Sequence, residues 1–475
     1  MGLMDALRTA QGSLAIQSTL GGIASTNVAR ATEEHYARRD APTTTDAAGA
    51  RLVRIGRATN GALEAARLDA TTRSSGAETR ATGIRALRDL FGGPDAEASP
   101  SVLLSDLRGA LQTFAAEPGS VPGASAAVEK ARSFAEGLNR IGRGIATLRS
   151  DADAAIARDV GELGRLLERF GEQNAAVVLA SRTGTDGSDA ADARARTLAE
   201  MAELLSFRMM ERDHGDLVLV ASGPEQAVLF DTVPRPVAFT PTNLTNALDA
   251  GASVILDGIA MTTAMGGRIG ASLELRDAIA PDLAKQADAL AAMAIETFAD
   301  RSADGSVTAP GLFVDPSGSP VQDGLAARIA LGAAFDPDQG GNPLALRDGA
   351  PSGPAAGRNP GNAAGFTAVL IERIEAIDEA RALDPQLGLG DTVSLADATA
   401  SQLGMLELRR SEAEGAREGA GSALERARAA HSNATGVNID EEMARLVAIE
   451  QSYRAAARVL AVAETMFDDL FAATR

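Results

Sequence analysis

Cysteine and tryptophan are absent from this 475-residue chain, and lysine occurs only at Lys130 and Lys285. Without cysteine the chain can form no disulfide, no thiolate nucleophile and no cysteine-ligated zinc site, although any redox compartment remains compatible. Basic residues are in deficit, because 45 Lys and Arg stand against 64 Asp and Glu, for a net charge of −19. Such a field repels nucleic-acid phosphates and anionic lipid head groups. We therefore expect neither nucleic acid nor a membrane as a partner.

The sequence also has no uncharged apolar run long enough to cross a bilayer. A cleavable secretory signal is not expected, since Asp5 and Arg8 interrupt the apolar start of the chain. At this length we expect two or three domains with sizeable cores. If the chain is exported, the export route must read a signal of another kind.

Residues that could bind a metal are scattered. The three histidines, His35, His214 and His431, lie in separate regions without metal-ligand spacing. We interpret them as surface or packing residues. Asp336 and Asp338 surround a proline and lack the closing glutamate of a calcium loop, so they indicate a solvated turn.

Phosphate binding and carboxylate chemistry are equally unsupported. Gly388-Leu389-Gly390 lacks the third glycine and the preceding strand of a dinucleotide-binding motif. Glu441 and Glu442 are neighbours on a predicted helix, so their side chains point apart. They suit the first turn of a helix that Asn438 or Asp440 can cap. We predict no catalytic, cofactor-binding or metal-binding residues and no cofactor, and we expect a protein that is not an enzyme.

The upstream half of the chain predicts a long helix. Between Phe134 and Val177, apolar residues recur at alternating steps of four and three, with one slip between Ala155 and Ile156. A sustained seven-residue repeat indicates a helix packed along its length against other helices. Asn174 occupies a core position of this repeat, where it would fix the register.

The middle of the chain has a different pattern. At roughly 215–256, short apolar runs such as Leu217–Val220 and Ala227–Phe230 are separated by Gly and Pro, which predicts strands joined by turns. Roughly 300–360 is rich in loop residues and indicates irregular structure or an insertion. Helical patterning returns at Phe366 and continues to the end. The sequence thus predicts a mainly α fold with a smaller β-containing middle, an α+β arrangement.

The last segment is the most regular, with apolar positions every seven residues and partners three residues after most of them. This stripe predicts an assembly helix, and alanines in two of its layers would let a partner helix approach closely. Its residues are Ile439, Leu446, Ile449, Tyr453, Ala456, Leu460, Ala463, Phe467 and Leu470.

A second amphipathic stretch lies at the start of the chain, broken by the pair Gly21-Gly22. The two amphipathic ends could pair as a coiled coil, or each could pack on its own neighbouring domain, and periodicity alone favours neither. The apolar residues of this N-terminal assembly helix are Leu3, Leu7, Leu14, Ile16, Leu20 and Ile23.

Two segments with specific sequences carry a resemblance to a known family. The run that begins Gly436-Val437-Asn438-Ile439 and continues to Leu470 is similar to the terminal signature of flagellar hook-associated protein 1. The segment Gly266–Asp277 resembles that family's glycine pair before a helix start that ends in Arg-Asp. This second match favours the hook-associated protein over hook or rod proteins.

A third, weaker match lies near the N-terminus and is similar to the family's Asn-rich box and the Gly-Tyr-x-Arg turn after it. Thr26 and Ala29 stand where Asn is usual, and His35 stands where Gly, which adopts positive φ at low cost, usually precedes the Tyr. The family-motif residues that we single out are Ser25, Asn27, Tyr36, Arg38, Gly267, Gly270, Arg276 and Asp277.

The resemblance implies a structural subunit that joins the hook to the filament of the bacterial flagellum by self-assembly through its terminal helices. It implies paired terminal helices that form a coiled-coil domain from residues 1–40 and 436–475. It further implies a helical core domain from residues 41–210 and 361–435. Residues 211–360 would form an inserted, strand-containing middle with an irregular insertion.

The resemblance also implies partners and a location. The partners would be further copies of the chain, hook protein, hook-associated protein 3 and a flagellar export chaperone. The protein would be secreted by the flagellar type III apparatus without a cleavable signal peptide, and would act in motility at the extracellular hook–filament junction. The alternatives are another axial protein (hook-associated protein 3 or a flagellin-like subunit), a helical scaffold outside the flagellum, or a hydrolase that uses carboxylates of the middle region.

Overall fold

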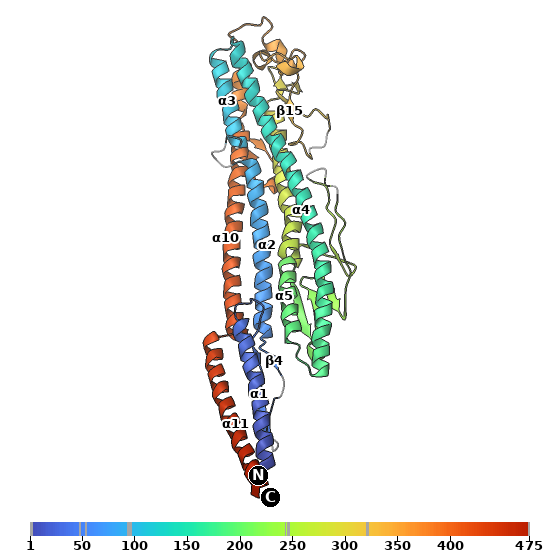
Figure 1. The fold of residues 1–475 in the computed structure, drawn as a ribbon. Coiled ribbons are helices and arrows are strands. Elements are labelled where there is room, and N and C mark those ends of the chain that lie inside the picture. The colour runs from blue at the N-terminus through green and yellow to red at the C-terminus, as the bar shows by residue number, and fades with distance from the viewer. Residues whose placement is uncertain are drawn as a thin grey trace.

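The computed structural model describes residues 3–46, 49–52, 55–92, 97–242, 244, 248–319 and 323–473. Long helices form an elongated body, and the helices α1 and α11 extend from one end of it, so that both chain termini lie near the tip (Figure 1). The helices are α1 (Leu3–Ala29), α2 (Gly61–Phe91), α3 (Pro100–Ala116), α4 (Val121–Thr183), α5 (Ser188–Leu204), α6 (Gly267–Glu274), α7 (Ala280–Thr297), α8 (Ala345–Asp348), α9 (Ala368–Ala376), α10 (Leu395–Thr435) and α11 (Ile439–Ala473).

The strands are short and form small antiparallel sheets, most of them in the middle of the chain. The largest has the order β5-β6-β7-β8, from β5 (Phe207–Glu211), β6 (Leu217–Ala221), β7 (Val228–Asp231) and β8 (Val233–Pro234). A second has the order β11-β10-β9, from β9 (Val237–Ala238), β10 (Ile255–Leu256) and β11 (Ile259–Ala260). The two-stranded pairs are β1 (Arg39–Asp40) with β4 (Gly56–Arg57), β2 (Thr43–Asp46) with β3 (Gly49–Leu52), β12 (Asp300–Arg301) with β13 (Thr308–Ala309), β14 (Phe313–Val314) with β15 (Ala330–Leu331) and β16 (Arg381–Ala382) with β17 (Thr392–Val393). The predicted mainly α fold with a β-containing middle is confirmed.

The helix predicted between Phe134 and Val177 is the centre of α4, which runs for 63 residues. Ser120 caps its start by accepting a hydrogen bond from the Gly123 backbone, and Gly184, in the left-handed conformation, ends it. Asn174 is buried as predicted. Its amide joins α4 to β6, because its Oδ1 accepts a hydrogen bond from Leu217 N at 3.2 Å.

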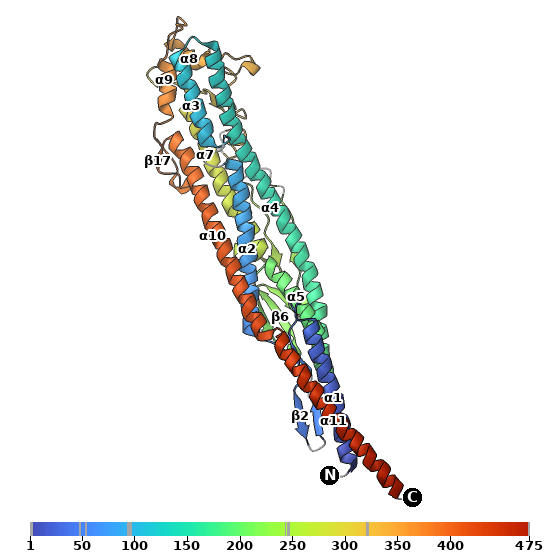
Figure 2. The same ribbon diagram turned by 60° about the vertical axis from the view of Figure 1, so that its left-hand side comes forward.

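Two clusters of buried apolar side chains lie along α4. The distal core, far from the chain termini, combines α2, α3, α4, α7, α10 and the irregular segment 312–346. The proximal core combines α4, α5 and α6 with the four-stranded sheet, and Phe170 meets Phe230 there edge to face at 4.9 Å. Figure 2 shows how α4 spans both regions. Each core draws on segments from more than one of the predicted domains.

The glycine of the family motif, Gly267, lets three helices meet. Its φ is +61°, and an added Cβ would lie 2.4 Å from the Leu204 carbonyl oxygen at the end of α5. The carbonyl oxygen of Gly267 in turn lies 3.1 Å from the position of a Cβ on Gly76 of α2. Gly270 is equally constrained, since its Cβ would lie 2.8 Å from the Thr263 carbonyl oxygen. The motif glycines therefore serve close packing of α2, α5 and α6.

The Arg-Asp end of the same motif forms a buried ion-pair network. Arg276 and Asp277 lie in a π-helical segment, Leu275–Ile279, between α6 and α7. The Arg276 guanidinium bonds Asp153 of α4 at 2.5 Å and Asp277 at 2.7 Å, and it donates to the Ala252 carbonyl oxygen at 2.7 Å. These bonds satisfy a charge that is almost fully buried. Arg276 and Asp277 thus hold α4, the π-helical segment and the loop before β10 together.

We predict that Gly267→Ala lowers the free energy of unfolding by about 2–4 kcal/mol, because an alanine at positive φ costs about 1–3 kcal/mol and its methyl group would also overlap the Leu204 carbonyl. Thermal unfolding followed by circular dichroism measures the loss. The matched control is Gly258→Ala, at φ +79° with open space around it, which should cost about 1 kcal/mol. Equal losses for the two variants would contradict the packing role of Gly267.

Candidate functional site

The terminal helix pair holds most of the predicted C-terminal stripe against α1. The two helices pack along each other and run in opposite directions, and a Cβ on Gly21 would lie 3.8 Å from Ile449 Cγ2. Ile439 and Tyr453 remain exposed, and the Leu470 side chain lies outside the described residues. The buried or half-buried stripe residues are Leu446, Ile449, Ala456, Leu460, Ala463 and Phe467.

The N-terminal stripe lies on the facing helix. α1 is continuous from Leu3 to Ala29, so the interruption predicted at Gly21-Gly22 is wrong. Glycine costs a helix interior only about 1 kcal/mol relative to alanine, and packing against α11 offsets that cost. The Leu3 side chain lies outside the described residues. The buried or half-buried residues are Leu7, Leu14, Ile16, Leu20 and Ile23.

A second apolar stripe on α11 stays exposed although α1 covers the other face of the helix. We call Met443, Val447, Val459, Val462 and Met466 the outer stripe, and their exposures lie between 49% and 60%. Residues 459, 462 and 466 follow helical spacing and share one face. The heptad pattern missed this stripe because its residues lie outside the a and d columns. The apolar character of these five residues was the sequence signal that could have revealed the outer stripe.

Between the helix pair and the body lies a polar region that we call the joint: the loop 30–39, strands β1 and β4, the start of α5 and the end of α10. The loop folds around the fully buried side chain of Asn27. Asn27 Oδ1 accepts hydrogen bonds from the Tyr36 hydroxyl at 2.6 Å and from Arg39 N at 3.0 Å. Its Nδ2 donates to the Arg39 carbonyl at 2.9 Å. The structure thus brings Asn27 and Tyr36 together, whereas Ser25 is exposed.

Arg38 connects the same loop to the other end of the chain. Its backbone N donates to the Thr435 carbonyl at the end of α10, at 2.8 Å. Its guanidinium lies 3.7 Å from Glu441 on α11. His35, where the family usually has glycine, does not have a positive φ. The turn therefore forms without glycine.

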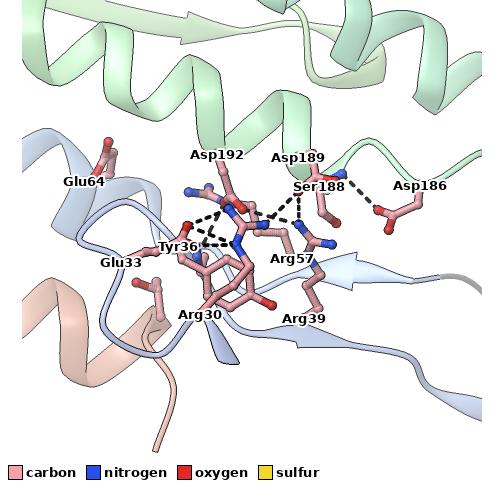
Figure 3. Close-up of polar contacts among 12 residues, drawn as sticks. Arg30, Glu33, Tyr36, Arg39, Arg57, Glu64, Asp186, Ser188, Asp189 and Asp192 are labelled. Atoms are coloured by element: carbon pink, nitrogen blue, oxygen red, sulfur yellow. Dashed lines mark hydrogen bonds and ion pairs between the residues drawn. The ribbon is translucent and has the colours of Figure 1, made fainter. Parts of the chain in front are cut away.

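Three arginines of the joint meet two aspartates on the first turns of α5 (Figure 3). Arg57 Nε donates to Asp192 Oδ1 at 2.7 Å, and Arg39 Nη2 lies 3.6 Å from Asp192 Oδ2. Asp189 accepts hydrogen bonds from Arg39 and, at 2.8 Å, from Arg30. The hydrogen bond from Arg39 is the main reason that the pKa of Asp189 lies below its usual range. Sequence patterns could not reveal this cluster, because its arginines lie more than a hundred residues from its aspartates.

Two of the scattered histidines also meet in the joint. His35 and His431 line one cavity of about 210 Å³ between the loop, the start of α2 and the end of α10. His431 Nε2 lies 3.2 Å from Glu64 Oε2, and Arg67 pairs with the same carboxylate at 2.8 Å. Burial lowers the pKa of both histidines. They remain packing residues, as predicted, but they share one site.

Other sequence candidates contribute no chemistry here. Asn438 caps α11 by accepting a hydrogen bond from Asp440 N at 3.0 Å. Asp336 pairs with Arg132 of α4 at 2.8 Å. Within the described ranges, no three His, Asp or Glu side chains are arranged to hold a metal ion. In that same part of the chain, no helix is long and apolar enough to cross a membrane.

Comparison with known families gives matches to the middle and to the C-terminal end of the chain. The family model of the flagellar hook-associated protein FlgK helical domain matches residues 85–311, and that of the flagellar basal body rod FlgEFG protein C-terminal region matches residues 429–472. The first range contains the Gly266–Asp277 motif, and the second contains most of α11. The two matches support flagellar hook-associated protein 1 as the protein that this chain resembles, and they indicate a structural component of the flagellar axis.

Among solved structures, the flagellar hook junction protein FlgK from Burkholderia pseudomallei is 18% identical to this chain. The alignment covers 54% of this chain and 46% of the solved one, with a TM-score of 0.44. This chain therefore matches less than half of the solved chain's length. A search of curated proteins found no match.

We predict that Asn27→Ala loosens the joint. The Tyr36 hydroxyl and the Arg39 backbone would lose their partners, at about 1–3 kcal/mol for each buried group left unsatisfied. Trypsin should then cleave the chain faster within the loop that contains Arg38. Ser25→Ala, two residues away on the exposed side of α1, should leave the cleavage rate unchanged. A rate for Asn27→Ala equal to the parent's would contradict the role of Asn27.

The histidine cavity predicts an acid-sensitive joint. Because the folded chain lowers the pKa of His35 and His431 below that of an unfolded chain, about 6.5, the unfolded state binds more protons as the pH falls through this range. The free energy of unfolding is therefore highest above about pH 6.5 and declines as the pH falls below that value. Circular dichroism melts at pH 7.5 and 5.5 should show a smaller decline for His35→Gln/His431→Gln than for the parent. An identical decline would assign the acid sensitivity to other groups.

Proposed function

We propose that this chain joins the hook to the filament of the bacterial flagellum by self-assembly through the helix pair α1 and α11. The outer stripe on α11 carries this proposal. An exposed apolar stripe of this kind on a helix pair that projects beyond the body is suited to contact neighbouring subunits. The match of residues 85–311 to the FlgK helical domain supports the choice of those neighbours.

The proposal assigns the two stripes of α11 to different contacts. We call the buried or half-buried stripe residues of α11, which include Leu460, the inner stripe. The inner stripe holds α1 and α11 together within one chain. The outer stripe, which includes Val462, remains free for another copy. We propose that residues 1–40 and 436–475 act as this assembly unit. Residues 41–210 with 361–435 would form the helical core, and 211–360 the middle region, as the sequence predicts.

The same proposal extends to partners and location. We propose that the chain contacts further copies of itself, hook protein and hook-associated protein 3. A flagellar export chaperone would hold it before export by the type III apparatus without a cleavable signal peptide. The assembled protein would then lie outside the cell at the hook–filament junction and would act without catalysis. The match to the FlgK helical domain, rather than to a flagellin, supports this position over that of another axial subunit.

The experiment is complementation of a deletion strain with variants of α11. We expect Val462→Asp, at an exposed outer-stripe position, to abolish motility, because a charge in a dry seam between subunits costs several kcal/mol without a partner. Leu460→Asp should also abolish motility, by separating α1 from α11. Neither should change the main melting transition of the purified monomer, since neither apolar core includes a residue of α11.

Arg458→Asp is the control for Leu460→Asp, because Arg458 is exposed and lies outside the a and d columns. It should swim nearly as well as the parent. Normal swimming of Val462→Asp would remove the outer stripe from the assembly surface. Normal swimming of a clean deletion strain would contradict the junction role altogether.

A further inference from the structure

The terminal helix pair is attached to the body without a shared apolar core. Among the described residues, the two cores include nothing before Leu68 on α2 and nothing after Ala413 on α10. The chain passes between body and helix pair through two short irregular segments, 58–60 and 436–438. Since neither core reaches the helix pair, contacts within the joint must set the direction in which the pair leaves the body.

The polar contacts that do so converge on α5. β1 and β4 form a ribbon in which Arg39 and Arg57 are direct cross-strand partners. Directly opposed residues share one face of a ribbon, so the two guanidinium groups lie side by side. Asp189 and Asp192, three residues apart on α5, share one face of that helix. The ribbon and the helix therefore present matched pairs of opposite charges (Figure 3).

The two aspartates differ in their surroundings. The Asp189 side chain is 78% exposed, so water and salt weaken its ion pairs. The Asp192 side chain is only 3% exposed. It has Arg57 at 2.7 Å and Arg39 at 3.6 Å, and its Oδ1 also accepts a hydrogen bond from Ala37 N at 3.4 Å. A buried carboxylate with three partners from the loop and both strands constrains all of them at once.

We infer that Asp192 is the positioning residue that fixes the angle between the terminal helix pair and the body. Asp192 belongs to the body, and its three partners belong to the segment between α1 and α2. Their backbone is in turn fixed to α1, because Asn27 bonds both the N and the carbonyl of Arg39. The rigid path therefore runs from α5 through Asp192, Arg39 and Asn27 to α1.

The ion pairs of Asp192 therefore control the orientation of the joint. With Asp192 paired to both arginines, the joint has one orientation. Without the charge of Asp192, Arg39 and Arg57 lose their buried partner, and the helix pair can turn on the two short connections. The direction of the terminal helix pair then depends on Asp192, whereas the stability of the body depends on its own cores.

The absence of cysteine permits a direct test, because two introduced cysteines can be spin-labelled specifically. We choose Ser18→Cys on α1 and Glu172→Cys on α4, both at exposed positions, and measure their distance by electron paramagnetic resonance in the monomer. The parent should give a single narrow distance distribution. Asp192→Asn, which keeps the shape and removes the charge, should broaden and shift it, while the melting transition of the body stays unchanged.

Two further variants test the contact of Asp192 specifically. Arg57→Gln removes a partner of Asp192 and should also broaden the distance distribution. Combining it with Asp192→Asn should produce little further change, because both substitutions remove the same interaction. Asp186→Asn removes a charge near the start of α5 from a carboxylate that bonds only the Ser188 backbone among the contacts described, and it should leave the distribution narrow.

Three results would overturn the inference. One is a broad distribution in the parent, and another is an unchanged distribution in Asp192→Asn. The third is loss of the body's melting transition in Asp192→Asn, which would make Asp192 part of the body's own stability. Because the measurement is made on the monomer, it stands independently of the proposed assembly.

Discussion

Burial of the apolar stripe on α4, which follows a seven-residue repeat, organises the body. The stripe supplies Phe134 to the distal core and Phe170 to the proximal core, so a single helix fixes the distance between two apolar clusters that share few other elements. Helices α2, α3, α5, α6 and α7 pack on α4 and cover parts of this stripe. The irregular segment between β12 and α9 covers its far end, and the four-stranded sheet covers its near end. An elongated body follows from the length of one helix.

Much of this fold could be predicted from periodicity. The long helix around residues 134–177, the strands near 217 and 228 and the C-terminal helix all depend on local spacing, which the sequence shows directly. The error at Gly21-Gly22 has a physical cause, since a weak helix former can be held in a helix by a partner that the local sequence does not reveal. Local propensity is a weak prior where tertiary packing contributes more.

The joint could be predicted only in part. Asn27, Tyr36 and Arg38 were identified through a family motif, but Arg39, Arg57 and Asp192 were not. The charge of one arginine among many carries no information about which distant carboxylate it will meet. The same limit hid the meeting of His35 with His431. Periodicity also indicates that a helix face is apolar without showing whether the partner is within the chain or outside it, which is why the outer stripe of α11 emerged only from the structure.

The lack of tryptophan leaves the two tyrosines as the main source of near-ultraviolet emission in this protein. One, Tyr36, is buried beneath two guanidinium groups in the joint, and the other, Tyr453, is exposed on α11. One phenol ring therefore lies in the joint, and the other lies on the helix that we propose contacts neighbouring subunits. Unlabelled protein carries one native optical reporter for the coupling of its two parts and another for the proposed assembly contact.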